Sequence, residues 1–260
     1  MKENPQKKHI DTSWNKVASW YDELLNTDSD SYQSKVIAPN LLRILDLKKG
    51  EVVYDLACGQ GYFSNIFYKA GAQVIASDLS KKLIEVATKN YPKGIKFYNS
   101  KADRAQFLKD SSVDTVVIIL AIQNIENVNE VLNESKRILK KNGRIVMVLN
   151  HPTFRVPKGS DWYFENGVQY RKVGQYLSES KISIDMTPGE KNPHKKIKTI
   201  SFHRPLQYYV KLLSKNGFAI TRLEEWISHK KSQSGPRQKA EDIARKEIPI
   251  FMCLEIKKIL

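Results

Sequence analysis

Short apolar runs alternate with amphipathic stretches along most of the chain. The apolar runs at 52–56, 72–77, 95–98, 113–120 and 144–149 predict strands, and the i, i+3, i+4 spacing of apolar residues at 34–47, 80–90 and 126–140 predicts helices. Ser80 is a good N-cap for the second of these helices, and Asn142-Gly143 is expected to end the third. Alternating strands and helices indicate an α/β fold, a mostly parallel sheet with helices on both faces.

The regular pattern is interrupted between residues 151 and 200. This stretch is rich in proline, glycine and aromatic residues and is too long for an ordinary connection. We expect an insertion after the fifth strand, with sparse structure, over the carboxyl ends of the strands where ligands of such sheets bind. The pattern then resumes with a predicted helix at 205–215 and strands at 218–226 and 248–256, separated by a polar, basic excursion at 229–246.

The turn after the first strand has the composition of a cofactor cradle. It reads Asp55-Leu56-Ala57-Cys58-Gly59-Gln60-Gly61, and the next strand ends in an isolated acid, Asp78. Glycines let the backbone pass close to a ligand, and an acid some 20 residues further on is placed to bind two ribose hydroxyls. The G-x-G-x-x-G pattern of nicotinamide sites is missing, and a carboxylate at the strand end suits an ammonium group better than a pyrophosphate.

In this motif the chain resembles the class I S-adenosylmethionine-dependent methyltransferases, whose first motif reads D/E-x-G/A-x-G-x-G. The resemblance covers residues from about 50 to 150 and is of the broad type-11 kind. It implies a Rossmann-like seven-stranded sheet with an antiparallel hairpin-like end, an N-terminal helical lid (1–48) and a methyltransferase domain (49–260). It also implies S-adenosyl-L-methionine as cofactor. The residues implied around it are Asp55, Ala57, Gly59 and Gly61 at the methionine moiety, Asp78 at the ribose with Leu79 beside it in the sequence as a further cofactor contact, Ala102 and Asp103 at the adenine, Ala121 after the fourth strand, and Tyr21 from a lid helix at 12–26.

A candidate acceptor site follows the fifth predicted strand. Asn150, His151, Pro152 and Phe154 resemble the Asn/Asp-Pro-Pro-aromatic motif with which amino-methyltransferases of nucleic acids hold an exocyclic amine, although His151 replaces the first proline and the family places the motif after strand four. A proline-stiffened turn with a buried histidine explains the same residues. Candidate substrate contacts are Arg155, Trp162, Tyr163, His203 and Arg204, which combine phosphate-binding and stacking side chains.

The formal net charge of +15 is unevenly distributed. Residues 1–149 carry 22 Lys and Arg against 17 Asp and Glu, and residues 150–260 carry 21 against 11. A phosphate-rich partner explains this excess; a general compositional bias toward lysine is the alternative. Methylation of an RNA base, such as cytidine N4, is therefore the leading hypothesis. A small-molecule methyltransferase of the quinone or secondary-metabolite type, with an anionic substrate, is the first rival, and a non-enzymatic binding module is the second.

Composition adds three expectations. The two cysteines have no metal-ligand spacing and the five histidines are scattered, so no metal site is expected. Cysteine usage favours a reduced, cytoplasmic compartment. No stretch approaches the roughly 20 apolar residues of a membrane span, and the N-terminus lacks a signal-peptide pattern.

Overall fold

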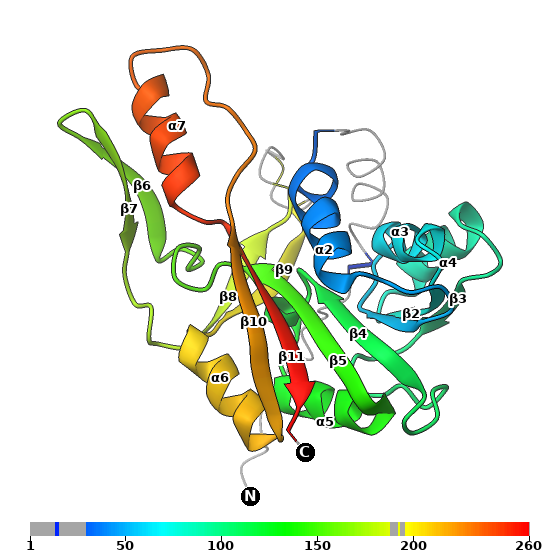
Figure 1. Ribbon diagram of the computed structural model, residues 1–260. Coiled ribbons are helices and arrows are strands. Elements are labelled where there is room, and N and C mark those ends of the chain that lie inside the picture. Colours follow the sequence, from blue (N-terminus) through cyan, green and yellow to red (C-terminus); the bar gives the residue numbers. More distant parts are fainter. Residues whose placement is uncertain (1–13, 16–29, 188–191, 193–195, 260) are drawn as a thin grey trace, which may run out of the picture.

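The centre of the molecule is a seven-stranded sheet with the strand order β10-β11-β5-β4-β1-β2-β3 (Figure 1). The computed structural model describes residues 14–15, 30–187, 192 and 196–259. Strands β1 to β5 run parallel, and β11 lies antiparallel between β5 and β10. The predicted fold class is therefore confirmed. The strands are β1 (Val52–Leu56), β2 (Gln73–Asp78), β3 (Lys96–Asn99), β4 (Val113–Ile119), β5 (Leu139–Asn150), β10 (Phe218–Trp226) and β11 (Phe251–Lys258).

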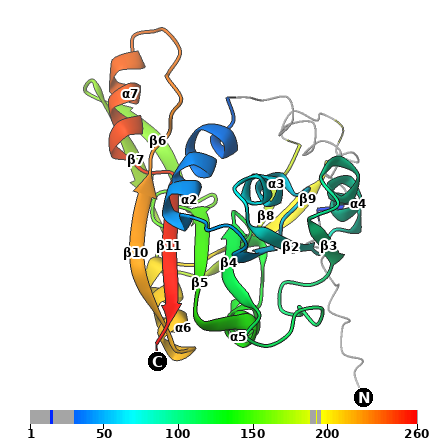
Figure 2. The same cartoon turned by 45° about the vertical axis from the view of Figure 1, so that its right-hand side comes forward.

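Helices cover both faces of this sheet because the strands alternate their side chains between two cores. Figure 2 shows α2 and α3 on one side of the sheet and α5 and α6 on the other. Val53 of β1 packs with α2 and α3, whereas its neighbour Tyr54 belongs to the core formed with α5 and α6. Ser80 caps α4 as predicted, since its side chain accepts from the backbone N–H of Leu83 at 3.2 Å. The helices are η1 (Gln33–Ile37), α2 (Ala38–Leu45), α3 (Tyr62–Lys69), α4 (Lys81–Asn90), η2 (Ile122–Asn124), α5 (Val128–Ile138), α6 (Leu206–Lys215) and α7 (Gln238–Glu247).

Two predicted boundaries differ from the structure. Helix α5 ends at Ile138, not at Asn142-Gly143, because Leu139 already pairs with Val113 of β4 and is fully buried. Asn142 and Gly143 belong to β5, where a Cβ on Gly143 would come within 3.0 Å of the Asp114 carbonyl oxygen. Strand β11 begins at Phe251 because Ile248, its expected start, is the C-terminal cap of α7.

The insertion after β5 is more ordered than its composition predicts. Strands β6 (Ser160–Glu165) and β7 (Val168–Val173) form one antiparallel hairpin, and β8 (Ser180–Asp185) and β9 (Lys198–His203) form a second. The expectation of sparse structure was wrong, because backbone pairing across each hairpin does not require the hydrophobic periodicity of a core strand. Helix α7 lies in the predicted polar excursion and contacts β7. The β6–β7 hairpin and α7 together form an arm that projects from the rest of the molecule (Figures 1 and 2).

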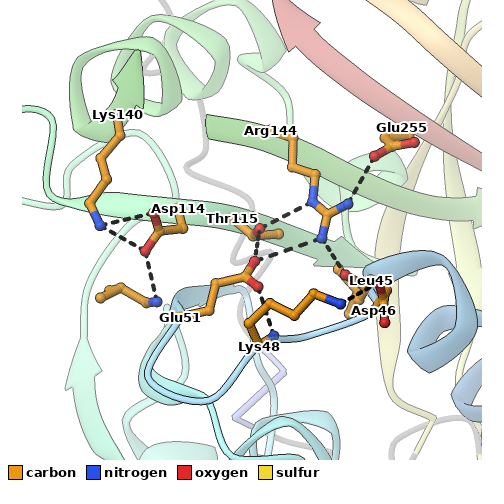
Figure 3. A network of polar contacts seen from close by, with 10 residues as sticks. Leu45, Asp46, Lys48, Glu51, Asp114, Thr115, Lys140, Arg144 and Glu255 are labelled. Atoms are coloured by element: carbon orange, nitrogen blue, oxygen red, sulfur yellow. Dashed lines mark hydrogen bonds and ion pairs between the residues drawn. The ribbon is translucent and has the colours of Figure 1, made fainter. Parts of the chain in front are cut away.

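The amino ends of the central strands are joined by a polar network around Arg144 (Figure 3). Its guanidinium donates to Glu255 of β11 at 3.0 Å and to Thr115 of β4 at 3.3 Å, and it also bonds the Leu45 carbonyl at the end of α2. The Thr115 hydroxyl in turn donates to Glu51 at 2.8 Å. One side chain thus ties three neighbouring strands and a helix together at the edge of the sheet where each parallel strand begins.

The predicted helix at 34–47 is present as η1 and α2. The predicted lid helix at 12–26, with Tyr21, lies outside the described residues except for Trp14 and Asn15. The division into a lid (1–48) and a methyltransferase domain (49–260) remains a prediction. In the part of the chain that the structure describes, no helix combines the length and the apolarity that crossing a membrane requires.

Candidate functional site

A cavity of about 760 Å³ opens at the carboxyl ends of the parallel strands. Each strand contributes residues from its end or from the turn that follows: Asp55 and Ala57 from β1, Asp78 from β2, and Asn150 from β5. The β8–β9 hairpin closes the opposite wall with Ile184, Met186, Thr199 and Ser201. The cavity therefore has a half formed by strand ends and a half formed by the insertion.

The turn between β1 and α3 is shaped by three residues with positive φ: Ala57 (60°), Gly59 (58°) and Gly61 (84°). Gly61 is the N-cap of α3, and a Cβ there would lie 2.9 Å from the ring of Phe97, so close packing requires glycine. Ala57 adopts the left-handed conformation despite its Cβ, in the position where the resembled family allows glycine or alanine. The sequence motif thus encodes a backbone shape.

Asp78 organises the same turn from the neighbouring strand. Its carboxylate accepts from the backbone N–H of Gly59 at 2.9 Å and from that of Ser80 at 2.8 Å. Burial raises the pKa of Asp78 above its usual value, and the two backbone hydrogen bonds oppose that rise. The acid at the end of the second strand therefore lies directly beside the glycine turn, as the motif spacing predicts.

Asp55 is a buried carboxyl at the base of the cavity. Only 2% of its surface is exposed, and the Ser64 hydroxyl of α3 donates to it at 2.6 Å. Burial, together with the nearby Asp78 carboxylate, raises the pKa of Asp55 to about 7. A cation bound in the cavity would favour the ionised form of this carboxyl.

Three side chains that line the cavity carry buried polar atoms without a partner among the described residues. Both amide atoms of Gln60, the side-chain oxygen of Gln123 and the hydroxyl of Thr199 make no hydrogen bond. Buried polar groups are normally paired, so such a concentration at one cavity is typical of a site that binds a polar ligand. Gln60 stood inside the recognised motif; Thr199 lies on the insertion, and sequence patterns gave no signal for it.

The predicted cofactor residues gather in the half formed by the strand ends. Gly61 is not part of the cavity wall, and Tyr21 lies outside the described residues. The predicted residues that do line the cavity are Asp55, Ala57, Gly59, Asp78, Leu79, Ala102, Asp103 and Ala121.

The predicted acceptor motif is only partly at the cavity. Asn150 lines it, whereas His151, Pro152 and Phe154 do not. The His151 ring is 4% exposed; its Nδ1 accepts from the backbone N–H groups of Thr153 and Phe154, so Nε2 donates to Glu225 at 2.6 Å. Burial lowers the pKa of His151. This geometry matches the alternative interpretation, an exit turn organised by a buried histidine.

Of the predicted substrate contacts, likewise, only some lie at the cavity. Arg155 lines the cavity, while Trp162 and Tyr163 lie on β6 outside it. His203 and Arg204 are 4% and 5% exposed. His203 bonds the Tyr176 carbonyl, and neither residue is available to a substrate anion in this conformation.

Arg204 holds the loop that follows β4. Its guanidinium donates to the carbonyl oxygens of Ile125 at 2.9 Å, Glu126 at 2.8 Å and Ile122 at 3.4 Å. This loop lines the cavity through Gln123 and the residues around it. Arg204 is therefore a structural link between the insertion and the cavity wall.

The comparisons with known proteins agree with this geometry. Residues 54–147 match the family described as a methyltransferase domain. A demethylmenaquinone methyltransferase from Streptomyces avermitilis is 30% identical over 152 residues, which are 56% of this chain and 65% of that protein. Another from Paenarthrobacter aurescens is 30% identical over 60% of each chain. The chain thus spans less than two thirds of the length of either relative.

Solved structures share the fold. An S-adenosylmethionine-dependent methyltransferase from Mesorhizobium loti superposes with a TM-score of 0.66 at 23% identity, over 84% of this chain and 96% of that one. The 1,6-didemethyltoxoflavin N1-methyltransferase from Burkholderia thailandensis, with its ligand and S-adenosylhomocysteine, gives 0.53 at 14% identity, over 94% and 88%. Residues 54–147 therefore match a methyltransferase domain, and the solved structures show that the chain has the fold of the S-adenosylmethionine-dependent methyltransferases.

Proposed function

We propose that this protein transfers the methyl group of S-adenosylmethionine to a small molecule. The observation that carries the proposal is a single cavity in which the cofactor half, at the strand ends, is continuous with a half enclosed by the β8–β9 hairpin. Its volume of about 760 Å³ lies within the range of small-molecule sites, about 300–1,000 Å³. The acceptor space that remains beside a bound cofactor is then suited to a compact ligand.

The cofactor supplies an activated methyl group on a positively charged sulfur, and the protein's part is to position and desolvate. Asp78, fixed by two backbone N–H groups, is the proposed ribose ligand. Asp55 provides a buried carboxyl for the cationic end of the cofactor. Burial of the acceptor against the β8–β9 wall excludes water, and alignment with the methyl group lowers the barrier.

The RNA-base hypothesis finds less support. Its proposed stacking residues, Trp162 and Tyr163, lie outside the cavity, and two of its proposed phosphate contacts, His203 and Arg204, are buried. The relatives named as demethylmenaquinone methyltransferases also favour a small acceptor. A binding module without turnover is the remaining alternative, and only an activity measurement separates it from an enzyme.

The test is transfer of radiolabelled methyl groups from S-adenosylmethionine to a host extract that is then separated into RNA, DNA, protein and small-molecule fractions. We expect label in the small-molecule fraction, lost in Asp78→Ala and kept in Asp110→Ala, whose carboxylate is on the surface at Arg137. Label in RNA would contradict the proposal. Binding of cofactor with no labelled product in any fraction would favour the non-enzymatic alternative.

A further inference from the structure

Three basic side chains line the acceptor half of the cavity: Arg155, Lys158 and Arg171. They come from the turn after β5 and from β7. All three lie beyond residue 147, where the match to the methyltransferase domain ends. They are therefore features of this chain's own acceptor side.

Arg171 is held in place without a carboxylate. Its Nε donates to the Phe154 carbonyl at 2.8 Å, one terminal nitrogen donates to the Ser160 hydroxyl at 2.8 Å, and its guanidinium lies 5.1 Å from the Trp162 ring centre. It forms no ion pair among the described residues. Its hydrogen-bond partners are neutral, so they leave the guanidinium without an ion pair at the cavity, although the Asp161 carboxylate acts on it from nearby and raises its pKa.

Arg155 has neither a side-chain hydrogen bond nor an ion pair within the described part of the chain. Burial lowers the pKa of Arg171, and the charge of Arg155 lowers it further, so the two guanidinium groups are close enough to repel each other. Lys158, with φ of 57°, projects from the same turn, and its ammonium likewise has no partner in the described residues. Like charges gathered in this way are stabilised by an anion placed among them.

The carboxylates of the same cavity do not neutralise this charge. Asp55 accepts from Ser64, Asp78 accepts from Gly59, and Glu126 pairs with Lys181 of β8 at 2.9 Å. Asp103, the fourth carboxylate of the wall, forms no ion pair with the three basic side chains among the described residues. The wall of the β8–β9 hairpin adds apolar Ile184 and Met186 together with the unpartnered hydroxyl of Thr199. The acceptor half therefore combines surplus positive charge with an apolar wall and a free hydrogen-bonding group.

We propose that Arg155, Lys158 and Arg171 form an anion subsite that binds a carboxylate or phosphate group of the methyl acceptor. This inference rests on the proposed function and narrows it to anionic small molecules whose remaining body is partly apolar. Arg155 supplies the free donors, because the donors of Arg171 are partly used within the protein. A planar oxyanion can accept two N–H groups of one guanidinium, which fixes the orientation of the acceptor as well as its affinity.

The experiment measures binding of benzoate, phenyl phosphate and neutral benzamide to protein saturated with S-adenosylhomocysteine, by calorimetry at low salt. We expect at least one of the two anions to bind tenfold or more tightly than benzamide, and the stronger of them identifies the carboxylate or the phosphate as the preferred group. Arg155→Gln should weaken the binding of that anion at least tenfold. Arg155→Glu should abolish binding of the anion and allow binding of benzylamine, the cationic analogue.

The matched control is Arg237→Gln, which removes an exposed arginine at the start of α7; its guanidinium lies over Phe164, outside the cavity. Each variant must bind S-adenosylhomocysteine like the unaltered protein, which shows that it is folded. If S-adenosylhomocysteine binds but benzamide binds as well as the anions, or Arg155→Gln has no effect, the anion subsite is refuted and the proposed function survives. If S-adenosylhomocysteine does not bind to the unaltered protein, the proposed function itself fails.

Discussion

Replacing Arg204 with methionine removes the side chain that joins the insertion to the loop after β4. Methionine keeps a similar apolar length but donates no hydrogen bonds. The substitution leaves three loop carbonyls, those of Ile122, Ile125 and Glu126, without their donor. It also removes the contacts of the guanidinium with the rings of Phe202 at 4.8 Å and Tyr208 at 5.2 Å.

The magnitude follows from these contacts. The two short hydrogen bonds contribute about 3–6 kcal/mol together, at roughly 1.5–3 kcal/mol for each bond to a charged group. The two ring contacts add about 0.5–1 kcal/mol each. Against this, the buried guanidinium of Arg204 forms no ion pair among the described residues, so methionine recovers a desolvation cost of several kcal/mol. We expect a net loss of about 2–4 kcal/mol in the free energy of unfolding, or roughly 5–15 °C in Tm for a chain of this size.

Urea unfolding monitored by tryptophan fluorescence checks this value, with Arg237→Met as the control for losing an exposed arginine over an aromatic ring. Arg204→Lys distinguishes a structural role of the guanidinium from a role that depends on its positive charge alone. Lysine keeps the charge but presents no planar fork, so a structural role predicts that it restores less than half of the lost stability. A loss below about 0.5 kcal/mol in Arg204→Met, or full restoration by lysine, would refute the reasoning.

Three further predictions concern the cradle and the sheet. Asp55, with its pKa raised from 3.8 to about 7, stays protonated in the folded protein over a range where the unfolded chain has lost the proton. The free energy of unfolding of the ligand-free protein should therefore fall as pH rises from about 4 to about 7, by at most about 4 kcal/mol, and Asp55→Asn should remove this slope in urea titrations at several pH values. Gly61→Ala, with its Cβ against the Phe97 ring and a positive φ, should cost roughly 2–3 kcal/mol in the free energy of unfolding; an unchanged unfolding midpoint would contradict the packing role. Arg144→Met strips two partly buried carboxylates of a shared partner and should cost about 2–3 kcal/mol, compared with less than about 1 kcal/mol for Lys140→Met at the more exposed pair with Asp114; equal losses in the two variants would argue against the role of burial.

The sequence alone determined the parts of the molecule in which local pattern and tertiary structure agree. The strand–turn–helix of β1 and α3, the cap at Ser80 and the exact bounds of β10 follow from hydrophobic period and turn residues within a short window. The cofactor half of the site was predictable for the same reason. Its residues follow consecutive parallel strands, whose carboxyl ends meet at one edge of the sheet.

The acceptor half was decided by tertiary structure. Arg155 and Arg171 are brought together by the path of the chain from β5 to the β6–β7 hairpin, and Thr199 faces the cavity only because the β8–β9 hairpin folds across it. Arg204 and His203 have the composition of anion ligands, yet carbonyls far away in the sequence, such as that of Glu126, occupy their donors. A hydrogen bond from a side chain to a distant backbone carbonyl leaves no periodic pattern in the sequence. The same side chains could therefore be substrate ligands or structural links until the fold assigns their partners.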